Sequence, residues 1–138
     1  MGRASLGLAV FLILLGAGCG GGGDEKTVTV ACDDAAFRAQ DEELYVTKTS
    51  VSNAIGGQGD AALLLRDLRR ARTTLTTYLD AHPPCTDALR DIDANERKAI
   101  GSLDDAIDAL SDGNDADSEL EHSLALLTAA QTALASGS

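Results

Sequence analysis

The sequence predicts an all-α fold, an antiparallel up-down-up-down four-helix bundle over residues 32–138. Three observations predict it. After residue 32, apolar residues recur at steps of three and four, the spacing of one helix face. Glycine, proline and asparagine interrupt this pattern at three places and divide it into four stretches of about 20 residues. Helices of similar length joined by short loops are typical of antiparallel bundles.

The first predicted helix begins after Asp33 or Asp34, either of which can accept a backbone hydrogen bond as N-cap, and it ends before Gly56. Its apolar positions lie seven residues apart, at Phe37, Leu44 and Val51. Polar residues, including Gln40, occupy the positions between them. Residues 46–51 are also rich in β-branched side chains, which lowers helix propensity, so we expect this helix to be the weakest of the four.

The second predicted helix runs from Asp60, as N-cap, to about Ala81 and ends before Pro83 and Pro84. Its apolar stripe is Leu64, Leu68, Ala71, Leu75 and Tyr78. The third runs from about residues 85–87 to Ser111, with a stripe of Leu89, Ile92, Ala99, Leu103, Ala106 and Leu110, widened by Ile100 and Ile107. Gly101 in its middle costs about 1 kcal/mol relative to alanine, and a close helix contact is the expected reason, with a kink as the alternative.

The fourth predicted helix follows the turn Asp112-Gly113-Asn114 and starts at Asp115 or at Ser118. Ser118 and Glu121 have the spacing of a capping box. The apolar face of this helix is Leu120, Leu124, Leu127, Ala130 and Leu134, with Leu126 beside it.

Two cysteines, Cys32 and Cys85, lie just before the first helix and at the start of the third. In an up-down-up-down bundle those two points share one end of the molecule, so a disulfide between them agrees with the topology. Closing a loop of about 54 residues stabilises a fold by about 4 kcal/mol in the chain-entropy model. A reactive or metal-binding pair is the alternative, but no CxxC spacing accompanies it.

The first residues have the composition of a secretory signal peptide. Met1-Gly2-Arg3 is followed by an apolar run of about 12 residues and then by small residues. The run is shorter than the roughly 20 residues that span a bilayer. The segment Leu15-Gly16-Ala17-Gly18-Cys19 resembles a bacterial lipobox, although Gly16 stands where that pattern usually has leucine. The resemblance implies that Cys19 receives a diacylglyceryl group and becomes the mature N-terminus. An ordinary cleaved signal peptide is the alternative.

The domain organisation follows from these segments. We predict a signal peptide over residues 1–18, a lipidated N-terminus and flexible linker with Gly20–Gly23 over residues 19–31, and the bundle over residues 32–138. The mature chain resembles the small, alanine-rich helical lipoproteins of high-GC bacteria. The resemblance implies attachment to the cell membrane or outer membrane through Cys19, facing the periplasm or the cell exterior.

Charge and composition exclude several classes of partner. The net charge is −11 at pH 7, so nucleic acid is not an expected partner, because phosphate binding needs a basic patch. No lysine or arginine follows Lys98, whereas the same stretch has eight acidic residues. Few aromatic residues are present to stack on bases or sugars. No cofactor motif is visible, because the Gly20–Gly23 run precedes no strand-to-helix turn.

We find no catalytic constellation and therefore predict a protein that is not an enzyme. Glu96 falls on the seam of the third helix, where we expect it to face an arginine of the second helix or to extend to the edge. His82 and His122 are expected near opposite ends of the bundle and so cannot share a metal ion. Part of the turn after the third helix matches positions 1, 5, 6 and 12 of an EF-hand calcium loop, at Asp108, Asp112, Gly113 and Glu119. Position 3 of that loop is Leu110, which cannot supply an oxygen ligand.

Two functions follow as hypotheses. The first is a membrane-anchored lipoprotein of the cell envelope, a binding or structural module with a protein as its partner. The second is a carrier of a small ligand or divalent cation, held in the bundle interior or at the acidic turn between the third and fourth helices.

Overall fold

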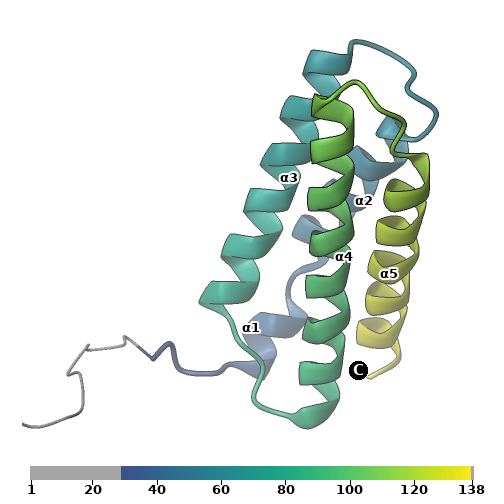
Figure 1. The fold of residues 1–138 in the computed structure, drawn as a ribbon. Helices are drawn as coiled ribbons and strands as arrows, with labels where there is room; N and C mark the ends of the chain where they lie inside the picture. The colour runs from purple at the N-terminus through teal and green to yellow at the C-terminus, as the bar shows by residue number, and fades with distance from the viewer. Residues whose placement is uncertain (1–28, 138) are drawn as a thin grey trace, which may run out of the picture.

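The computed structural model describes residues 29–137. The predicted signal peptide and Cys19 lie outside these residues. The described chain forms a short helix followed by four long ones: α1 (Asp34–Arg38), α2 (Asp41–Ala54), α3 (Ala61–Ala81), α4 (Asp87–Ser111) and α5 (Asp117–Ser136). Each long helix packs against two others, in the pairs α2 with α3, α3 with α4, α4 with α5 and α5 with α2 (Figure 1). The prediction of an all-α fold with four helices packed together is therefore confirmed.

The core consists of the predicted apolar stripes. Leu44 and Val51 of α2, and Leu68 and Leu75 of α3, have no exposed surface. The α4 and α5 stripes are buried in the same cluster, at Leu89, Ala99, Leu103, Ala106, Leu120 and Leu127. On α3 the prediction was wrong in one detail, because Leu79 is fully buried while Tyr78 is only partly buried.

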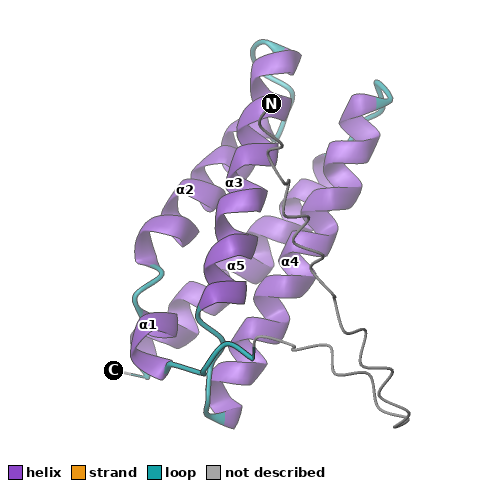
Figure 2. Ribbon diagram, turned by 90° about the vertical axis from the view of Figure 1, so that its left-hand side faces the viewer, coloured by secondary structure: helices purple, strands orange, loops and turns teal. Residues whose placement is uncertain are grey.

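The first predicted helix is two helices. The chain bends between α1 and α2 at Ala39 and Gln40 (Figure 2). Side chains take the place of helical hydrogen bonds here, since Tyr78 Oη donates to Ala36 O at 2.7 Å and Gln40 Nε2 donates to Phe37 O at 2.8 Å. A regular helix would use those two carbonyls to accept from the amides four residues later. The bend therefore depends on side-chain donors, one of them from a helix distant in sequence.

The helix starts follow the predictions in part. Asp60 caps α3 by accepting from the amides of Ala62 and Leu63, as predicted, and Asp33 caps α1. The capping box predicted at Ser118 and Glu121 is wrong, because α5 begins at Asp117 and its N-cap is Ala116. Ala116 is only 1% exposed, and Asp115 before it accepts from Asp117 N at 3.1 Å, so burial and the Asp115 carboxylate together accompany this helix start.

Gly101 corrects another expectation. It lies on the exposed side of α4, and a Cβ atom added there would meet nothing within 4 Å. A close helix contact is therefore not the reason for glycine at this position. The helix also continues through it to Ser111.

The loops bring distant helix ends together. The loop after α2 contains Gly56, whose amide donates to Asp117 Oδ1 at 2.9 Å, which joins the end of α2 to the start of α5. The loop between α3 and α4 holds Pro83, whose carbonyl accepts from Asp33 N at 2.9 Å. Among residues 29–137, no helix is both long and apolar enough to cross a membrane.

Candidate functional site

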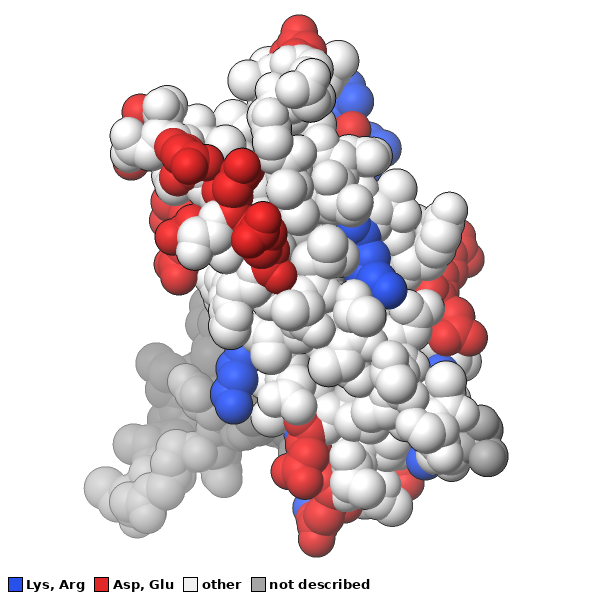
Figure 3. Space-filling model, turned by 90° about the vertical axis from the view of Figure 1, so that its right-hand side faces the viewer, with Lys and Arg blue, Asp and Glu red and all other residues white. Residues whose placement is uncertain are grey.

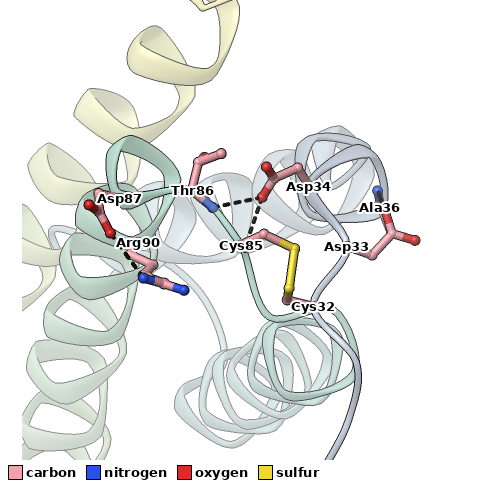
Figure 4. The surroundings of a disulfide bond; sticks show 8 residues. All are labelled: Cys32, Asp33, Asp34, Ala36, Cys85, Thr86, Asp87 and Arg90. Atoms are coloured by element: carbon pink, nitrogen blue, oxygen red, sulfur yellow. Dashed lines mark hydrogen bonds and ion pairs between the residues drawn. A yellow bond between two sulfur atoms is a disulfide. The ribbon is translucent and has the colours of Figure 1, made fainter.

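The N-terminal end of the described chain is fastened to the loop between α3 and α4. Cys32 and Cys85 form a disulfide, with their Cα atoms 5.1 Å apart (Figure 4). The pair that the sequence predicts is thus the pair that the structure shows. It links the chain two residues before α1 to the chain two residues before α4.

Asp34 reinforces this link. One carboxylate oxygen, Oδ1, accepts from the amides of Cys85 at 2.6 Å and of Thr86 at 3.2 Å (Figure 4). Thr86 is the N-cap of α4 but caps nothing with its own side chain, so Asp34 of α1 satisfies amides at this helix start from outside. The hydrogen bond from Cys85 N is the largest cause that lowers the pKa of Asp34. Sequence analysis identified Asp34 only as a possible cap of its own helix.

Phe37 completes the attachment of α1. Its side chain has no exposed surface and belongs to the main core cluster. Three features therefore hold the five residues of α1 in place: the disulfide, the two hydrogen bonds that Asp34 accepts, and the buried ring of Phe37. The predicted linker over residues 19–31 would lead directly into this fastened point.

Glu96 lies in the middle of the bundle, which corrects the expectation for this residue. It neither faces an arginine of α3 nor extends to the edge, because its side chain is fully buried. Neither carboxyl oxygen has a hydrogen-bond partner among the described residues. Arg97, the nearest cation along the chain, points instead to Asp80 of α3 and Asp93 of α4, at 2.9 and 3.1 Å.

The polar group that faces Glu96 is the amide of Gln40, at the bend between α1 and α2. Gln40 is also fully buried, and its Oε1 has no partner, while its Nε2 donates to Phe37 O. Burial raises the pKa of Glu96 from its ordinary 4.5 to about 8, and the Gln40 amide partly offsets that rise. Gln40 could have been suspected from the sequence, since it falls between Phe37 and Leu44 on the buried seam.

This buried pair has no access to a substrate. A general acid must lie within hydrogen-bond reach of the group it protonates, and Glu96 contacts only the interior. The arrangement can hold or release a proton, and it can link α4 to the bend between α1 and α2.

The acidic turn between α4 and α5 has several carboxylates close together but forms no metal centre within residues 29–137. Figure 3 shows one large group of acidic side chains toward the upper end of the face in view, with further acidic side chains at its lower end and along one edge. Asp115 accepts from Asp117 N, and Asp117 accepts from Gly56 N, so these carboxylates order the loop. Leu110 packs against the core and supplies no ligand. No group of three or more metal-ligating side chains is positioned to hold an ion in the part of the chain described.

The two histidines are in different surroundings. The ring of His82 lies 4.6 Å from that of Tyr78 at the end of α3. His122 is exposed on α5. Neither belongs to a metal-ligating group within residues 29–137.

The larger cavities are grooves on the outside of the helices. One of about 740 Å³ lies along exposed residues of α5, from Glu121 to Ser136, and another of about 420 Å³ lies between α2 and α5 beside Tyr45. The most enclosed cavity described measures about 70 Å³ and lies between Ala54 and Leu110. Small-molecule sites are typically about 300–1,000 Å³, so that enclosed cavity is too small for an ordinary organic ligand.

Comparisons with known proteins add no assignment. The chain matches no protein-family model, no curated protein sequence and no solved structure.

Proposed function

We propose that this chain is a lipid-anchored lipoprotein of the bacterial cell envelope. Its helical bundle serves as a non-enzymatic binding or structural module. The anchor holds it at the cell membrane or the outer membrane, facing the periplasm or the cell exterior.

The observation that carries this proposal is the position of Cys19. It follows a basic start, a short apolar run and the small residues Gly16, Ala17 and Gly18, which is the arrangement in which a cysteine thiol is acylated after export. Each buried methylene group contributes about 0.8 kcal/mol, and one acyl chain alone binds only marginally. The two chains of a diacylglyceryl group would therefore hold the domain stably.

The disulfide supports export. Disulfides form and persist in oxidising compartments outside the cytoplasm and are rare inside it. Cys32 and Cys85 are paired, whereas Cys19 has no cysteine left to pair with, which fits a thiol that carries lipid.

The contacts between helix ends support an antiparallel up-down-up-down order. The end of α2 is joined to the start of α5 by the hydrogen bond from Gly56 N to Asp117. The start of α1 is joined to the start of α4 by Asp34 and the disulfide. In that order the lipidated linker enters at the end that bears the disulfide, and the acidic turn between α4 and α5 lies at the far end.

A protein is the partner that fits this placement best. The far end would carry acidic side chains away from the membrane, and no lysine or arginine follows Lys98 to balance them. Opposite charge on a partner speeds encounter and selects against wrong partners. We therefore infer a partner with a basic surface, and no nucleic acid.

Metabolic labelling tests the anchor. Cells that express the full chain are grown with an alkyne-bearing palmitate, and the label on the protein is compared between wild type and Cys19→Ala. We expect the label to disappear in Cys19→Ala and to remain in a Cys32→Ser/Cys85→Ser control. Equal labelling of wild type and Cys19→Ala contradicts the proposal.

Crosslinking in intact cells tests the partner. An exposed residue near the acidic turn, such as Ser118, is replaced by a photocrosslinking amino acid, and Thr74 on the exposed face of α3 serves as the control position. We expect one discrete adduct from residue 118 that salt weakens. Adducts of the same pattern from both positions contradict a specific acidic docking end.

A further inference from the structure

Two polar side chains lie where the core is otherwise apolar. Glu96 of α4 and Gln40 at the bend are both fully buried, and they face each other. Three of their oxygens lack a hydrogen-bond partner among the described residues: both carboxyl oxygens of Glu96 and Oε1 of Gln40. Leaving such groups unpaired in a core costs about 1–3 kcal/mol each, so this cluster needs an explanation.

A proton on Glu96 supplies the missing donor. The three unpaired oxygens are all acceptors, and Nε2 of Gln40 gives one of its two N–H groups to Phe37 O. Its other N–H can serve at most one Glu96 oxygen and cannot serve the Oε1 of the same amide. A protonated carboxyl has an O–H that can donate to Gln40 Oε1, whereas a carboxylate accepts only. Glu96 O–H then donates to Gln40 Oε1, and Gln40 Nε2 donates to Phe37 O. Both the oxygen and the nitrogen of the Gln40 amide therefore have a hydrogen-bond partner.

The charges around Glu96 do not replace that proton. Asp93 and Arg97 of its own helix act on it in opposite directions, and Asp80 of α3 is held by Arg97. The buried polar side chain of α5 is the neutral Ser123, whose hydroxyl donates to the backbone of α4 at Ala99 O, at 2.9 Å. Burial accordingly dominates, and it raises the pKa of Glu96 to about 8.

Gln40 also lies where a change in its side chain would affect the start of α2. It stands at the break between α1 and α2, and its carbonyl accepts the first backbone hydrogen bond of α2, from Leu44 N at 3.0 Å. The disulfide and the Asp34 carboxylate fasten α1 to the start of α4, so we expect α1 to stay with α4 when α2 moves. Any change at Gln40 is therefore confined to the bend and the first turn of α2.

We propose that Glu96 and Gln40 form a proton-dependent latch, in which neutral Glu96 holds the α1–α2 bend against α4 and loss of its proton releases the bend. On release, the proton passes to water and the carboxylate requires a donor. The second N–H of Gln40 can donate to one carboxylate oxygen, but Gln40 Oε1 then has no donor and lies beside a buried negative charge. The bend then loses the hydrogen bond from Glu96 that ties it to α4.

Hydrogen exchange of the full chain, in mild detergent with the disulfide intact, tests the latch. Exchange is followed by mass spectrometry from pH 5 to pH 9.5, and each rate is corrected for the intrinsic pH dependence of amide exchange. We expect the opening constant of a peptide over residues 38–45 to rise about tenfold per pH unit up to about pH 8 and then to level off. Peptides from α5 should stay protected across that range.

Matched variants separate the latch from general charge repulsion. Glu96→Gln keeps the shape and removes the titration, so its opening constant should not change with pH. Glu121→Gln removes an exposed carboxylate of α5 and should behave as wild type. A flat wild-type profile, the same rise in Glu96→Gln, or simultaneous opening of α5 overturns the proposal.

A second measurement uses the wild-type chain alone, so it does not require any variant to fold. Carbon-13 NMR of side-chain carboxyl groups, on the same detergent-solubilised chain, follows every glutamate through its titration. We expect one glutamate to titrate near pH 8. Titration of all glutamates below pH 6 overturns the proposal.

Discussion

At the residue scale, the buried carboxyl of Glu96 makes stability fall as the pH rises toward 8. Its pKa is raised by burial to about 8, so the folded chain binds this proton more tightly than the unfolded chain, in which the pKa is ordinary. The contribution to stability is therefore complete below about pH 4.5 and is lost as the pH rises toward 8. The slope for one such group is about 1.4 kcal/mol per pH unit, and it ends above pH 8.

Urea unfolding of Glu96→Gln measures that slope. We expect wild type and Glu96→Gln to have similar unfolding free energies near pH 4.5. Near pH 8.5 the variant should be more stable by about 5 kcal/mol, the slope of about 1.4 kcal/mol per unit accumulated between pH 4.5 and pH 8, because it no longer has to bury a charge. Glu121→Gln is the control and should show no such divergence. A constant difference between wild type and Glu96→Gln at every pH would refute the assignment.

Gly101 yields a second prediction at this scale. Since a Cβ atom there meets nothing, Gly101→Ala should stabilise the protein by about 0.5–1 kcal/mol through helix propensity and reduced unfolded-state entropy. Gly113→Ala is the opposite control, because Gly113 has φ +77° in the turn after α4. That substitution should cost about 1–2 kcal/mol. Thermal unfolding measures both, and a loss of stability in Gly101→Ala contradicts the open space at this site.

At the element scale, the α1–α2 bend shows what sequence periodicity can and cannot predict. The seven-residue spacing of Phe37, Leu44 and Val51 correctly predicted which side chains are buried. It did not predict the break, because the donors that make the break possible are the side chains of Gln40 and Tyr78, and Tyr78 comes from α3. Local pattern contains no information about a contact 42 residues away.

The helix starts lead to the same conclusion. Asp60 was predictable because an N-cap acts on amides two and three residues later in its own helix. Asp34 was not, because it satisfies the amides of Cys85 and Thr86 across the fold. The Ser118 capping box failed because the N-cap of α5 is Ala116, which is buried and lies two residues before Ser118.

Asp34→Asn tests the hydrogen bonds by which Asp34 of α1 caps the start of α4. The native pKa of Asp34 is lowered, chiefly by the hydrogen bond from Cys85 N, so the carboxylate stabilises the fold above its ordinary pKa of 3.8. This stabilisation is lost as the pH falls through the lowered value. We expect Asp34→Asn to lower the urea midpoint at pH 7 and to match wild type at low pH. Asp91→Asn, exposed on α4, is the control and should leave the midpoint unchanged.

At the scale of the whole molecule, the disulfide was the most reliable guide to the fold. Cysteine count and helix order together predicted that residues 32 and 85 meet, and they do. The all-α class and most of the core followed from periodicity alone. The buried Glu96–Gln40 pair did not, since the position of Glu96 on the seam suggested only an arginine partner on α3 or extension to the edge, and the structure shows neither.

Removal of the disulfide has a defined expected cost. Cys32→Ser/Cys85→Ser should lower the unfolding free energy by about 4 kcal/mol, the entropy of closing a loop of that length in the unfolded chain. Helix α1 should lose protection from hydrogen exchange first, because it is only five residues long and the disulfide lies two residues before it. Reduction of wild type with dithiothreitol should reproduce both effects. Equal stability of reduced and oxidised wild type contradicts this role.

The attachment of the bundle to a membrane through Cys19 is the central claim, and intact mass is its most direct test. The protein is extracted from the membranes of a bacterial host and measured without reduction. The account predicts a mature chain that begins at Cys19, carries the mass of at least a diacylglyceryl group and is two hydrogens lighter than the dithiol because Cys32 and Cys85 are paired. A chain with an unacylated first residue and two free thiols would contradict it.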